Sequence, residues 1–345
     1  VPLATMLAGV VVRSVAMSAP LGAMGTPLAL AGSVLQIGAT ALFAGMLLVT
    51  FRRSLERLQP WMGFVFLALA CFVAQALFDG WHTWRTQMAP SREALLAQVA
   101  TFQAPLRDLQ IHGLALCMIL AVSQRFFPPF LGIPETPSRR GWLGLGALGL
   151  GLILESTLFV AFRLTDDHRW AAGLYLGWML LAAGVVLVVW PWRLWRTPAR
   201  NARSATFIRL AYAWLGLSLV MLLLLPGYQT LSGLPFSHAY YGAIRHAVTV
   251  GFVSQMIIGV STLVVPLIPR TATLRPALVL LNLGCFLRVS LQISSDWTPG
   301  AFRVIGASGM LELLALLLWV GVLWRGLLGR VPRATEIPAG AQVGR

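Results

Sequence analysis

The chain has 345 residues, of which 58% are hydrophobic and 11% are charged, whereas a soluble domain carries roughly 25% charged residues. This composition excludes a water-soluble enzyme. All 26 basic residues are arginine, and the formal net charge is +15. These arginines lie in short clusters between long apolar stretches, so they indicate membrane topology and argue against a nucleic-acid partner. The three cysteines are far apart in apolar stretches and predict neither a disulfide framework nor a CxxC metal site.

Apolar stretches long enough for a membrane helix recur along the whole chain. We predict an all-α polytopic transmembrane bundle of about ten helices, forming a single domain over residues 1–328. A short interfacial helix is predicted over 86–103, and a disordered cytoplasmic tail over 329–345. The predicted spans are 2–19, 27–50, 60–81, 108–128, 141–163, 170–192, 207–228, 241–268, 274–294 and 303–325.

The arginines divide unevenly between the two sides of this topology. One side, which includes the C-terminal tail, holds 16 of them, and the other side holds 7. Because positively charged loops stay in the cytoplasm, both termini are predicted to be cytoplasmic. The expected location is a bacterial inner (plasma) membrane, with the lipid bilayer as the main partner and membrane proteins as further candidate partners.

Two stretches of the chain share a pattern at an offset of 138 residues. Met118-Ile-Leu-Ala-Val-Ser123 is followed by Pro128, and Met256-Ile-Ile-Gly-Val-Ser261 is followed by Pro266. Each pattern lies in the second half of a predicted helix that follows a histidine. The echo indicates an internal duplication, which in membrane proteins often brackets a site. Chance matching of two apolar helices is the alternative.

Four segments, in the same order along the chain, resemble motifs of the NnrS family of bacterial membrane proteins. His246-Ala-Val-Thr-Val-Gly251, followed by Met256-Ile-Ile-Gly-Val, is similar to that family's HALTVG…MIL helix. Arg125-Phe-Phe-Pro-Pro-Phe130 resembles its GGRxxPxF element. The stretch 57–78 resembles its RNYLF…ANLLF helix, and Phe286-Leu-Arg288 with the helix after it matches in placement.

The resemblance implies a polytopic inner-membrane protein that carries haem and copper and acts in the response to nitric oxide and in denitrification. This chain is expected to be a divergent member. It begins where the third family helix would lie, so the N-terminal helix pair with its WHxHEM motif is expected to be absent. The family's FH pair appears here as Phe78-Asp79, its LGHTGR element as 265–270, and its double glycine as Ser123-Gln124.

The candidate cofactor ligands are histidines, because neutral imidazole binds haem iron and copper at a lower burial cost than a charged group. His246 and His112 are the leading candidates as haem or metal ligands, and we predict that they share a polar cavity near the outer face. His238 and His82 are weaker candidates, whereas His168 belongs to a solvated turn. An interhelical hydrogen bond is the alternative role for each membrane histidine.

Two glutamates, Glu155 and Glu312, fall inside predicted spans, where an ionised carboxylate needs a partner or water. They are candidates for a proton relay, or for ion pairs with Arg13, Arg125 or Arg245. We expect such an arginine pair for Glu312, and we expect Glu155 to face other helices and not lipid. Arg245 is a candidate partner for a haem propionate, with snorkelling to the interface as the alternative.

These features favour an NnrS-like integral membrane protein that binds haem or a metal and acts in nitric oxide or denitrification-linked stress. Haem is the first candidate cofactor and copper the second. Two alternatives stay open, a cofactor-free membrane scaffold or subunit and a transporter with a site between the two halves. The sequence carries no motif that decides whether the protein is an enzyme.

Overall fold

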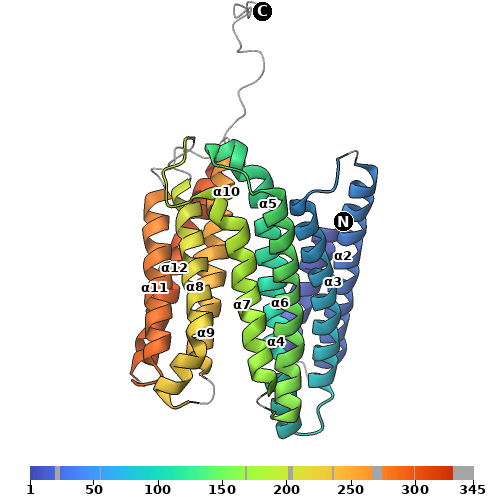
Figure 1. The fold of residues 1–345 in the computed structure, drawn as a ribbon. Helices are drawn as coiled ribbons and strands as arrows, with labels where there is room; N and C mark the ends of the chain where they lie inside the picture. Colours follow the sequence, from blue (N-terminus) through green and yellow to red (C-terminus); the bar gives the residue numbers. More distant parts are fainter. Residues whose placement is uncertain are drawn as a thin grey trace, which may run out of the picture. The chain divides into compact units, whose positions relative to one another are not determined.

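The protein is helical throughout its described part, as the all-α prediction requires (Figure 1). A computed structural model describes residues 1–19, 24–54, 56–167, 169–200, 205–234, 237–265, 274–298 and 300–328. Within these ranges, nine helices are long and apolar enough to cross a membrane. The remaining predicted span, 2–19, is α1 (Pro2–Ser18), an apolar helix of 17 residues that falls short of that length. The chain is therefore a multi-pass membrane protein.

The helices contact one another in two compact units, which are described separately. The first comprises residues 1–200 with 219–226, and the second comprises the described residues of 201–218 and 227–345. After α1, the first unit contains α2 (Gly25–Arg53), α3 (Pro60–Gln87), α4 (Arg92–Asp108), the π-helix η2 (Leu109–Leu116), α5 (Cys117–Phe127), the π-helix η3 (Pro128–Gly132), α6 (Ser138–Thr165), α7 (Arg169–Val189) and the short 3₁₀ turn η4 (Trp190–Trp192).

Most of α8 (Ala205–Ser232) belongs to the second unit, and its segment 219–226 belongs to the first. The second unit continues with α9 (His238–His246), the π-helix η5 (Ala247–Ser254), α10 (Gln255–Val264), α11 (Arg275–Ser294) and α12 (Ala301–Leu328). The predicted tail, 329–345, lies outside the described residues, and so does His168.

The interfacial helix predicted over 86–103 is wrong as a separate element. Residues Arg92–Gly132 instead form one continuous helical run of 41 residues, made of α4, η2, α5 and η3. Ser91 caps its start by accepting a hydrogen bond from the Ala94 N–H at 3.2 Å. No glycine lies between 93 and 112 to end the helix, and Pro105 is accommodated within α4. The charged first turn therefore leads directly into the apolar span.

Helices α6 and α7 pack backbone to backbone along a series of glycines. A Cβ atom added to Gly151 would lie 2.8 Å from the Gly177 carbonyl oxygen, and one added to Gly144 would lie 3.0 Å from the Gly184 carbonyl oxygen. Small residues permit this close approach between membrane helices. The two helices lie side by side in Figure 1. Their contact fixes the position of the one buried glutamate on α6, Glu155.

We predict that Gly151→Ala destabilises the first unit by about 1–3 kcal/mol, because its methyl group would enter a backbone contact that has no room for it. Gly146→Ala is the matched control, since a Cβ at that position on the same helix meets no atom within 4 Å. Reversible unfolding in mixed micelles measures both variants. Equal stability of the two variants would contradict the proposed backbone contact.

Candidate functional site

A buried cluster of three ionisable side chains lies where α4 passes into the π-helix η2. Asp108 is the last residue of α4, and His112 lies one turn further on. Glu155 approaches them from α6. The exposed fractions of these residues are 2%, 4% and 1%. Such residues inside a membrane span mark functional sites, because an ionisable group is costly to keep there.

The carboxylate of Glu155 is held by two partners from different helices. Its Oε2 lies 2.9 Å from His112 Nδ1, and its Oε1 accepts a hydrogen bond from Trp178 Nε1 of α7 at 3.0 Å. This arrangement confirms that Glu155 faces other helices and not lipid. A carboxylate bonded at both oxygens has a fixed orientation, so the cluster is built in advance of any ligand.

The cluster also has the composition of a metal site. One ligand atom each from Asp108, His112 and Glu155 lies within 4.8 Å of the other two. The donors are one imidazole nitrogen and two carboxylate oxygens. A metal ion at the centre of these atoms would receive three protein ligands from two helices.

The second unit contains its own histidine–glutamate pair. His246 is the last residue of α9, and its Nε2 lies 2.7 Å from Oε1 of Glu312 on α12. The two side chains are 19% and 12% exposed. The arginine partner predicted for Glu312 is therefore wrong. The neighbouring cation, Arg245, stacks over the Tyr241 ring at 4.5 Å.

The two units repeat the same local construction at the offset of 138 residues. The π-helix η2 covers Leu109–Leu116, and η5 covers Ala247–Ser254, so both ends of the two segments differ by 138 positions. A Cβ on Gly113 would meet Cys71 of α3, and a Cβ on the equivalent Gly251 would meet Trp214 of α8. Shared positions and shared packing support an internal duplication.

The ionisable residues differ between the two copies. At the offset of 138, His246 occupies the place of Asp108, and Val250 occupies the place of His112. Each unit therefore has a histidine–glutamate contact, but the contacts use different positions of the common framework. His112 belongs to the first unit and His246 to the second. A cavity shared by these two histidines stays a prediction.

The other predicted residues lie apart from these clusters. Arg125 forms an exposed ion pair with Glu56 at 3.5 Å. Arg13 pairs with Asp79. His82 is buried in α3, and its Nε2 has no hydrogen-bond partner among the described residues.

His238 begins α9 and is exposed, so the helix extends back far enough to carry both His238 and His246. The sequence analysis missed Asp108 and Trp178 as contributors to the site. For Asp108 a signal existed, since an acidic residue four positions before a histidine lies on the same helix face. No local pattern singles out Trp178, because its role depends on the contact between α6 and α7.

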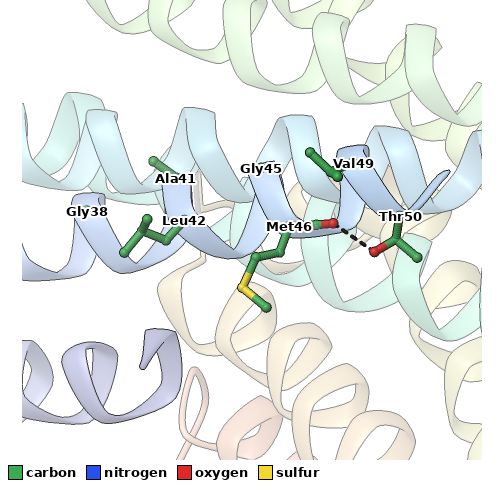
Figure 2. A pocket seen from close by; sticks show the side chains of 7 residues that line it. All are labelled: Gly38, Ala41, Leu42, Gly45, Met46, Val49 and Thr50. Carbon is green, nitrogen blue, oxygen red and sulfur yellow. Dashed lines mark hydrogen bonds between the residues drawn. The ribbon is translucent and has the colours of Figure 1, made fainter. Parts of the chain in front are cut away.

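An open groove on α2 contains no candidate ligand. Figure 2 shows its lining, which consists of Gly38, Ala41, Leu42, Gly45, Met46, Val49 and Thr50. The only hydroxyl group in it, that of Thr50, donates to the Met46 carbonyl oxygen at 2.9 Å. The groove has no ionisable side chain, so it provides no candidate ligand or catalytic group.

Comparison with known proteins gives no relative from which roles could be transferred. No protein-family model, curated protein or solved structure matches this chain. Functional assignment therefore depends on the geometry of the clusters themselves.

We predict that His112 and Glu155 are energetically coupled by about 1–2 kcal/mol, because each side chain is the hydrogen-bond partner of the other in an apolar environment. A double-mutant cycle with His112→Ala and Glu155→Ala, followed by unfolding in mixed micelles, measures this coupling. The control cycle pairs His112→Ala with Thr157→Ala, an exposed position on the same helix whose hydroxyl bonds only its own backbone turn. Additive effects in the first cycle would contradict the coupling.

Proposed function

We propose that this membrane protein binds a divalent transition-metal ion through Asp108, His112 and Glu155. The observation that carries the proposal is the convergence of one imidazole and two carboxylates within 4.8 Å, all buried in the first unit. Two buried carboxylates hold up to two negative charges in an apolar environment. A divalent cation neutralises both, which removes much of the cost of burying them.

The donor set favours some metals over others. Imidazole is a good ligand for iron, zinc and copper, whereas carboxylates suit harder ions such as manganese. A mixed set of one nitrogen and two oxygens therefore favours Fe(II), Mn(II) or Zn(II). Copper(I) prefers thiolate or thioether ligands. The nearby Cys117 thiol donates instead to the His112 carbonyl oxygen, at 3.3 Å.

The surroundings of the cluster suit an ion that stays bound and still reaches a small ligand. Three protein ligands leave coordination positions open for water or a small ligand. Catalytic metal sites have such open positions, whereas structural metal sites do not. The Trp178 N–H holds Glu155 from outside the ligand set. Such outer hydrogen bonds orient metal ligands and strengthen binding.

The NnrS resemblance supports a role for this site in the response to nitric oxide or in denitrification, at a bacterial plasma membrane. It also implies haem, for which His246 is the best-fitting ligand of the second unit. Its Nε2 contacts a carboxylate, the arrangement that orients many metal-bound histidines. Arg245 and His238 are the accompanying candidates, for a propionate and as a further imidazole. A bound haem would supply a redox-active iron.

We predict about one metal ion per chain in protein purified from metal-replete cells, measured by mass spectrometry of the metal content. Asp108→Asn, His112→Ala and Glu155→Gln should each lower the occupancy at least about tenfold, since second-sphere changes alone cost 10–100-fold in affinity. Glu93→Gln, an exposed change in the charged first turn of α4, is the control.

The outcomes of this experiment separate the alternatives. Unchanged metal content in all three cluster variants would remove the proposed site. A haem absorbance band that disappears in His246→Ala would assign haem to the second unit. Protein without metal and without a haem band, after growth with both supplied, would favour the cofactor-free scaffold or the transporter.

We further propose that the 17-residue helix α1 also crosses the membrane, which gives ten spans, and that both termini face the cytoplasm, as the arginine distribution supports. Reporter fusions after Arg57 and after Ala89 lie at opposite ends of α3. They should report opposite sides of the membrane, with the Arg57 fusion cytoplasmic. A periplasmic signal from the Arg57 fusion would reverse the orientation.

A further inference from the structure

Helices α9 and α11 are neighbours, and their contacts place Arg288 of α11 at the level of His246 of α9. A Cβ on Gly242 of α9 would overlap the Gln292 amide of α11. Further along the chain, the Asn282 side-chain amide of α11 donates a hydrogen bond to the Gln255 side-chain oxygen of α10 at 2.6 Å. These two contacts define an antiparallel register in which His246 lies opposite Arg288. The chain from α9 into η5 therefore passes along one face of α11.

Arg288 belongs to the face of α11 that points toward these neighbours. Gly284 and Cys285 are buried on this face, and Arg288 and Gln292 follow them at helical spacings of three to four residues. A Cβ on Gly284 would lie 2.7 Å from Cγ of Glu312. The His246–Glu312 pair thus lies next to the turn of α11 that leads to Arg288.

The charge of Arg288 is not balanced by any described side chain. In the described part of the chain, Arg288 makes no hydrogen bond or ion pair, and its Nε is buried without a partner. Both neighbouring carboxylates have other partners, since Glu312 contacts His246 and Asp296 accepts from Tyr228 and Ser237. An arginine inside a membrane span without a compensating group is costly.

In each unit an ionisable residue lies four positions after a glycine that contacts the following helix. Glu155 lies four residues after Gly151, which contacts the backbone of the following helix, α7. Arg288 lies four residues after Gly284, which likewise contacts the backbone of its following helix, α12. The two ionisable residues are 133 positions apart, not 138, so they do not occupy the same position of the internal echo. The comparison shows that a carboxylate follows the contact glycine in the first unit and a guanidinium follows it in the second.

We propose that the second unit binds one small oxyanion, a carboxylate or phosphate group, at Arg288, with the Gln292 amide beside it. A guanidinium forms paired, charge-assisted hydrogen bonds with such groups. The Gln292 amide oxygen is also buried without a partner among the described residues, and a flip of this amide would present two further donors. The site is independent of the metal cluster, which belongs to the other unit.

The test is calorimetric titration of the full chain in phosphatidylcholine nanodiscs, with sodium acetate and sodium phosphate as probes at fixed pH and ionic strength. One saturable site per chain is expected for at least one probe. Arg288→Gln should weaken binding at least tenfold, and Arg288→Lys, which keeps the charge without the planar donor fork, should have a smaller effect. Arg303→Gln removes the same charge from an exposed position of the same unit and should change nothing.

Each outcome of the titration tests the proposed oxyanion site at Arg288. The proposed site is wrong if neither probe shows saturable binding, or if wild type and Arg288→Gln bind equally. A circular-dichroism spectrum and a gel-filtration profile like those of the wild type establish that Arg288→Gln is folded. Repetition in phosphatidylglycerol nanodiscs identifies the source of the anion. If acetate and phosphate no longer bind in phosphatidylglycerol nanodiscs, and Arg288→Gln releases bound lipid, a lipid phosphate occupies the site. If their binding is unchanged in these nanodiscs, the site binds a free solute.

Discussion

An ionisable side chain inside a membrane helix must be neutralised by the protein or its ligand, because no bulk water is available to solvate it. The buried carboxylate of Glu155 imposes this requirement on the first unit. His112 and Trp178 meet it from two other helices, and those helices must therefore hold a fixed position relative to α6. The glycine contacts between α6 and α7 provide that position for Trp178.

The histidine side of the cluster depends on a local irregularity of the helix. Within the run Arg92–Gly132, the π-helix η2 widens the backbone between α4 and α5. Wide turns of this kind often occur at functional sites, where they change the direction of a side chain without ending the helix. Here the wide segment holds His112, and Asp108 directly precedes it. A regular helix would present these two side chains with a different rotation relative to α6.

Hydropathy and charge were sufficient to predict nine of the ten proposed membrane spans, since the cost of exposing backbone and polar groups to lipid acts locally along the chain. The partners of the glutamates were harder to predict. Glu155 and His112 are 43 residues apart, and their contact depends on which helices are neighbours in the plane of the membrane. The same limitation led to the incorrect arginine partner for Glu312. The 138-residue echo lies directly after both π-helices in the sequence, but it did not predict the wide turns themselves.

The matching positions of η2 and η5 also bear on the order of events in the history of the protein. The simplest origin of two wide turns at equivalent places is one wide turn in the ancestral helix, copied with it. The side chains around these turns now differ in charge, so they diverged after the copying. The ancestor therefore supplied the geometry first. Different ionisable side chains, such as Asp108 and His246, could then occupy equivalent positions on a single inherited backbone.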